Sequence, residues 1–126
     1  MLAGIDRLAD VYLANAKLAI AASETAAALP PGLVASEFDA MVSLYTGRPA
    51  IPLLPLMAAN YLRQRTPREA AAQLLQIIDA YHPSFLLVGS GEALQAANIL
   101  ARAGQPRIRF NSVSPSGIVL YVPVRP

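Results

Sequence analysis

The sequence predicts an α/β fold: a three-layer, mostly parallel, Rossmann-like sheet of about five strands that ends in an antiparallel hairpin. Short apolar runs of strand length alternate with longer stretches of helical periodicity, which is typical of a parallel sheet covered by helices. The last two apolar runs are separated only by residues 112–116, too few for a crossover helix. The length of 126 residues fits one domain spanning residues 1–126.

An alanine-rich helix is predicted over residues 3–28, because the two prolines that follow cannot continue it. Its polar stripe is narrow and consists of Asp6, Asp10, Lys17 and Glu24. Two interpretations are open. Either a wide face of this helix is buried in the core, which we favour, or a second apolar strip forms a contact surface for a homodimer. The residues of that strip are Val11, Leu13, Leu18 and Ile20.

The next segments predict a strand, a helix and a second strand. Residues 33–36 form the strand, and Ser36 is expected to cap the helix, with Asp39 completing a capping box. Gly47 is the expected left-handed stop of this helix. The second strand, residues 50–54, contains Pro52, which cannot donate to a ladder and therefore places the strand at a sheet edge. The expected buried face of the helix comprises Ala40, Met41, Leu44 and Tyr45.

The second half predicts two more helices and three strands. A short helix over residues 56–65 precedes a strong helix that starts with Thr66 as cap, Pro67 in the first turn and Glu69 for a capping box. A buried strand over 85–89 leads to a helix capped by Ser90 that runs to Gly104. The hairpin strands cover 106–111 and 117–124.

Right-handed crossovers and the edge position of Pro52 predict the strand order. The second, first and third strands should be neighbours in that order, with the hairpin beyond the third. The last strand is apolar on both faces, so we expect it inside the sheet. The strand that carries Arg107 and Arg109 should form the far edge, where charged side chains discourage pairing with other sheets.

Composition excludes several classes of function. Charged residues make up 14% and the net charge is +2, which is too weak to indicate nucleic acid. The mean hydropathy of +0.42 is high, yet charges interrupt the longest apolar stretch and no signal peptide is recognisable. Cysteine is absent and His82 is the one histidine, so we expect no metal.

The segment after the third strand resembles a dinucleotide-binding turn only superficially. Leu94 stands where the third glycine belongs, and the acidic residue expected about 20 residues later is missing. We therefore favour a tight turn at Gly89 and Gly91, and we expect neither a cofactor nor a catalytic residue in this chain. Ligands of α/β sheets usually bind at the carboxyl edge, which predicts a ligand-facing or membrane-facing edge made of Ser36, Glu37, Ser90, Gly91 and Glu92.

A helix ending in LPPG, followed by LVAS, an acid and LYTGRPAIP, resembles the C-terminal extracytoplasmic soluble domain of bacterial GT-C type integral-membrane glycosyltransferases. These are similar to protein mannosyltransferases and aminoarabinose transferases. The resemblance covers much of residues 15–55. Its signature turn comprises Thr46, Gly47, Arg48 and Pro49, and we expect it to be structural, with Arg48 in solvent.

The resemblance implies an accessory soluble domain of a membrane glycosyltransferase that uses a lipid-linked sugar donor. The domain would be non-catalytic by itself, because the catalytic acids of such proteins lie in their membrane part. It implies a periplasmic location and, as partners, the membrane-embedded portion or lipid head groups. The alternative is a free-standing α/β domain that binds a small molecule or oligomerises, and it would be cytoplasmic.

Overall fold

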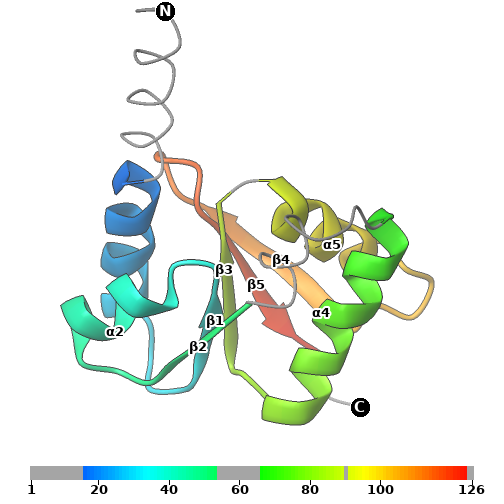
Figure 1. Ribbon diagram of the computed structural model, residues 1–126, viewed down its shortest axis with the longest axis horizontal. Helices are drawn as coiled ribbons and strands as arrows, with labels where there is room; N and C mark the ends of the chain where they lie inside the picture. The colour runs from blue at the N-terminus through cyan, green and yellow to red at the C-terminus, as the bar shows by residue number, and fades with distance from the viewer. Residues whose placement is uncertain (1–15, 54–65, 90, 125–126) are drawn as a thin grey trace, which may run out of the picture.

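The computed structural model describes residues 16–53, 66–89 and 91–124, and Figure 1 shows the arrangement of their elements. Residues 16–27 form a helical segment. The elements that follow are β1 (Val34–Ser36), α2 (Asp39–Thr46), β2 (Ala50–Pro52), α4 (Pro67–Tyr81), β3 (Phe85–Val88), α5 (Gly91–Ala101), β4 (Ile108–Val113) and β5 (Val119–Pro123). The predicted helix over 56–65, the Ser90 cap and the first residues of the predicted N-terminal helix lie outside the described residues.

The five strands form one mixed sheet in the order β2-β1-β3-β5-β4, which confirms the predicted strand order. β1 pairs in parallel with β2 and with β3. β5 returns antiparallel to β3, and β4 pairs antiparallel with β5. Pro52 lies in the edge strand β2, as its missing donor requires.

Two apolar clusters lie on opposite faces of the sheet, because successive side chains of a strand alternate between its faces. One contains Leu86, Val88 and Tyr121 from the strands together with residues of α4 and α5. The other contains Val34, Leu87 and Leu120 together with alanines of the helical segment and Val42 of α2. The helical segment and α2 therefore share one face, and α4 and α5 share the other, as Figure 1 shows.

The ends of α4 follow the chemistry predicted from its sequence. The Thr66 hydroxyl accepts a hydrogen bond from the Glu69 N–H at 3.2 Å, and the Glu69 carboxylate accepts one from the Thr66 N–H at 3.2 Å. Pro67 occupies the first turn, where its missing N–H costs nothing. His82 ends the helix in a left-handed conformation, and its N–H donates to the Ile78 carbonyl.

The predicted cap of α2 is wrong. Phe38, and not Ser36, is the N-cap, and no side chain caps the helix. Ser36 belongs to β1 and is fully buried, and its hydroxyl accepts a hydrogen bond from the Phe38 N–H at 3.0 Å. The hydroxyl therefore stabilises the two-residue turn between the end of β1 at Ser36 and the start of α2 at Asp39. Gly47 ends α2 in the left-handed conformation at φ 71°, as predicted.

The predicted buried face of α2 is also wrong. Val42 is the buried residue, whereas Met41, Leu44 and Tyr45 are 41%, 85% and 60% exposed. Ala40 is exposed as well. The four residues do share one side of the helix, but that side faces away from the sheet. The periodicity of the sequence correctly places these apolar residues on one side of α2, but it does not show whether that side packs against the sheet.

The hairpin and α5 differ from their predicted bounds. β4 covers Ile108–Val113 and is therefore shifted by two residues from the predicted strand over 106–111. The loop between the two hairpin strands starts correspondingly later. A register shift between Phe110 and Ser112 marks a β-bulge. The helix α5 ends at Ala101 and not at Gly104.

Candidate functional site

The predicted ligand edge is assembled at the carboxyl ends of β1 and β3. These strands pair in parallel, with Ser36 opposite Leu87, so Glu37 and the segment after Val88 meet at one edge. Gly91 and Glu92 start α5 at the same edge, and Ser90 lies outside the described residues. The structure thus brings Ser36, Glu37, Gly91 and Glu92 to one end of the sheet.

Protein groups fill part of this edge. The Glu37 carboxylate accepts a hydrogen bond from the Gly89 N–H. A Cβ atom at Gly89 would lie only 3.1 Å from the Phe38 ring and 3.3 Å from the Ile118 side chain. Glycine at this position therefore makes room for the ring of Phe38, which packs against the apolar cluster of α2. Ligand binding at this edge stays a prediction, and the Gly89 amide is already in use.

Arg48 of the signature turn binds the end of the helical segment and the loop that follows it. Its Nη1 donates hydrogen bonds to the carbonyls of Ala26 at 2.6 Å and Leu29 at 3.2 Å. Its Nη2 donates to the carbonyls of Pro30 and Gly32, both at 2.7 Å. The guanidinium carbon also lies 5.9 Å from the centre of the Phe85 ring, within cation–π range. The expectation that Arg48 lies in solvent is therefore wrong. Its guanidinium is a clamp that binds four backbone carbonyls.

The two prolines that precede β1 explain why a side chain is needed here as a donor. The last carbonyls of a helix require donors from outside the helix. The N–H groups of Ala28 and Leu29 donate to the carbonyls of Thr25 and Ala26. Pro30 and Pro31 have no N–H groups, so the chain offers no further backbone donor before Gly32. A side chain with several donors can supply the rest, and the planar fork of arginine carries five N–H groups. Sequence reasoning missed this role, although an accounting of backbone donors around LPPG could have indicated it.

The other residues of the signature turn also have structural roles. The Thr46 hydroxyl donates to the Val42 carbonyl at 2.6 Å and accepts from the Arg48 N–H at 3.1 Å. The Pro49 carbonyl accepts from the Val34 N–H at 3.4 Å and so joins the turn to β1. A cavity of about 530 Å³ lies beside this turn, lined among others by Ala27, Tyr45 and Arg48. All four N–H groups of the two terminal nitrogens of Arg48 are engaged, which makes the turn a structural element.

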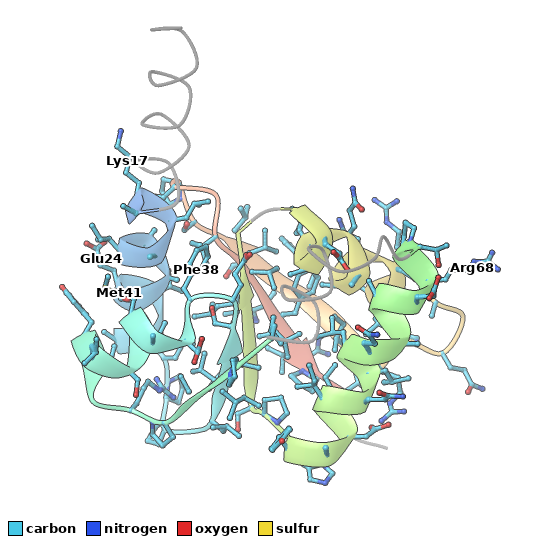
Figure 2. The ribbon with its side chains drawn as sticks, viewed as in Figure 1. Lys17, Glu24, Phe38, Met41 and Arg68 are labelled. Carbon is cyan, nitrogen blue, oxygen red and sulfur yellow. The ribbon has the colours of Figure 1, made fainter. Side chains whose placement is uncertain are left out.

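An apolar surface lies on the outside of α2. We call it the α2 surface and define it by three residues, Met41, Leu44 and Tyr45. Ile20 of the helical segment is 48% exposed, but it lies beside Lys17, Glu24 and Ser116 and does not belong to this surface. Figure 2 shows Lys17 and Glu24 of that segment pointing away from the sheet, as the predicted polar stripe requires. Leu18 is half-buried against the core, whereas Val11 and Leu13 lie outside the described residues.

The buried Tyr121 has a perturbed phenol pKa. Its ring is buried under α5, and its hydroxyl donates to the Asn98 side-chain oxygen at 2.6 Å. Burial raises the pKa of Tyr121 above its ordinary value of 10.0, and the positive charge of Arg102 lowers it by less. This hydrogen bond fastens α5 to the sheet.

Within residues 16–53, 66–89 and 91–124, no group of three or more His, Cys, Asp or Glu side chains could hold a metal ion. None of the helices in this part of the chain is long and apolar enough to cross a membrane. Comparison with protein-family models, with curated proteins and with solved structures found no match.

Proposed function

We propose that this chain is an accessory domain of a bacterial GT-C type membrane glycosyltransferase, non-catalytic by itself, that docks on the membrane-embedded portion through the α2 surface. The observation that carries the docking function is the exposure of Met41, Leu44 and Tyr45 on one side of a short helix. Contiguous apolar patches are rare on the surface of soluble monomers, and where they occur they often mark an interaction site. The transferase itself is proposed from the sequence resemblance.

The structural roles found in the signature turn support this proposal. The resemblance lies mainly in residues 15–55, and the described residues 16–53 contain the helical segment, β1, α2 and β2. Arg48, just before β2, binds the carbonyl of Ala26 at the end of the helical segment and the carbonyl of Gly32 before β1. A motif that acts as such a clamp fits a resemblance of local fold rather than of reaction.

The arrangement of the elements supports an orientation toward the membrane. In Figure 1 the described start of the helical segment, drawn in blue, lies at the same end of the sheet as the start of α5. We therefore propose that the edge with Ser36, Glu37 and Glu92 faces the lipid head groups on the periplasmic side, while the α2 surface contacts the membrane-embedded portion. The two apolar clusters on opposite faces of the sheet further support a three-layer, Rossmann-like arrangement.

A photo-crosslinker at position 44 tests the proposal directly. Among the described residues Leu44 is the most exposed large apolar residue, at 85%, so a bulky group there should not disturb the fold. In membranes of the native host, we expect it to crosslink a many-helix membrane protein that transfers sugar from a lipid-linked donor. The control is the same group at Arg68, an exposed residue of α4 that points away from the molecule in Figure 2.

Three outcomes would contradict the proposal. Equal crosslinking from positions 44 and 68 would mean that the α2 surface is not selective. A crosslink to a second copy of the chain would favour the oligomerisation domain instead. A crosslink confined to soluble proteins would leave the membrane glycosyltransferase without support.

A further inference from the structure

The strand β4 is an open edge of the sheet. Among the described residues it pairs only with β5. Every residue from Arg109 to Val113 is exposed, and only Ile108 at its start is buried. An edge strand presents a row of backbone N–H and C=O groups that a further strand can use. At six residues, β4 is the longest strand that the structure describes and offers the longest such row.

The two faces of β4 differ in character. Phe110 pairs with Tyr121 and Val113 pairs with Val119, so both lie on the face covered elsewhere by α4 and α5. They are 53% and 58% exposed, and the Phe110 ring meets the Tyr121 ring edge to face, with centres 6.2 Å apart. Arg109 lies on the opposite face. A strand added to this edge would therefore meet apolar side chains on one face and a guanidinium group on the other.

The positive charge at this edge is not balanced within the described residues. Arg107 forms an ion pair with Asp79 of α4, but neither Arg102 nor Arg109 has such a partner there. The sequence contains no acidic residue after Glu92. A cavity of about 630 Å³ lies at the start of β4, and Arg102 and Phe110 are among its lining residues.

These charges distinguish between two occupants of the edge. A second copy of this chain, paired through its own β4, would bring arginines of like charge together. The bulge after Phe110 also increases the local twist, which opposes the pairing of two identical edges. A flexible segment with negative charges can follow the twist and neutralise Arg109.

We propose that β4 is a docking strand for an extended acidic segment of another protein, which adds to the sheet as a sixth strand. Its apolar side chains would pack beside Phe110 and Val113, and its acidic side chains would face Arg109. Backbone hydrogen bonds supply affinity in this binding mode, and alternate side chains supply specificity. This inference stands on β4 and does not depend on the function proposed for the α2 surface.

The test uses two fluorescent eight-residue peptides, one of alternating glutamate and valine and one of alternating lysine and valine. Fluorescence anisotropy with the 126-residue chain should show saturable binding of the glutamate peptide only. Arg109→Glu should weaken that binding about tenfold and shift preference to the lysine peptide, because like charges at an interface repel. Arg109→Ala should give an intermediate loss. The matched control, Arg68→Glu, should leave binding unchanged.

Amide hydrogen exchange locates the bound peptide. Exchange should slow in residues 108–113 when the glutamate peptide is present and should not change in α2. The proposal is overturned if both peptides bind alike, if neither binds, or if protection appears outside β4. It is also overturned if sedimentation shows that the chain dimerises by itself and Arg109→Glu abolishes the dimer.

Discussion

The guanidinium of Arg48 supplies N–H donors to the Ala26 carbonyl of the helical segment and to three carbonyls of the loop that follows it. Four carbonyls from residues 26 to 32 converge on its two terminal nitrogens. Charge and shape both matter, because one ammonium group has three donors at a single point whereas the guanidinium spreads its donors over a fork. The side chain holds the helical segment and the signature turn in one arrangement.

Arg48→Ala should therefore destabilise the fold. Hydrogen bonds from a charged group contribute about 1.5–3 kcal/mol each at most, and water replaces part of the loss, so we expect the free energy of unfolding to fall by roughly 2–4 kcal/mol. Arg48→Lys should recover less than half of this. Urea unfolding followed by circular dichroism measures both, with Arg68→Ala as the exposed control. Equal midpoints for Arg48→Ala and Arg68→Ala would show that the clamp contributes nothing.

Tyr121 makes stability depend on pH at the alkaline end. Because burial raises its pKa in the folded chain above 10.0, the unfolded chain loses this proton first and binds fewer protons above pH 10. The free energy of unfolding should then fall as pH rises from 10 through the raised pKa. Tyr121→Phe should remove this part of the pH dependence, at the cost of the hydrogen bond to Asn98. Urea midpoints between pH 8 and about 11 test it, and identical slopes for the two proteins would contradict it.

At the scale of the element, α2 and α4 are helices of very different construction. α4 has 15 residues, a complete capping box and five buried side chains. α2 has eight residues, no side-chain cap and one buried side chain, Val42. Short isolated helices are marginal in water, so α2 depends on that contact and on its left-handed stop at Gly47. The exposed side of α2 contributes little to the fold and is available for binding.

Two substitutions in α2 should separate these roles. Val42→Ala removes buried methyl groups and should lower the free energy of unfolding by roughly 1–3 kcal/mol. Leu44→Glu changes a side chain that is 85% exposed and should stay within about 0.5 kcal/mol of the parent chain. Thermal unfolding of both variants checks the difference. A large loss for Leu44→Glu would mean that residue 44 belongs to the core.

The capping box of α4 gives a prediction of known size. Thr66→Ala removes the acceptor for the Glu69 N–H and should cost about 1 kcal/mol of stability. Thr66→Asn retains an acceptor at this position and should restore most of it. Denaturant midpoints of the three proteins measure the effect, and a loss of the same size in Thr66→Asn would rule out capping as its cause.

At the scale of the whole molecule, the strand order could be predicted and the surfaces could not. Pro52 and the short connection between the last two strands limit the topology, because a missing donor and a chain too short for a crossover are local facts with global consequences. The burial of α2 could not be predicted, since periodicity places Met41, Leu44 and Tyr45 on one side without saying what lies opposite. The role of Arg48 depends on carbonyls 16 to 22 residues earlier. The sequence around LPPG shows that backbone donors are few, but it does not show which distant side chain supplies them.

The two edges of the sheet are unequal, and this limits how the molecule can assemble. At one edge β2 has only three residues and includes Pro52, so it offers a poor template. At the other edge β4 offers six residues. Growth of a fibre requires each added unit to present a new acceptor at its far side. A molecule with one good edge can accept a single strand and then stops, so sheet-to-sheet assembly of this chain should end at discrete complexes rather than continue into filaments.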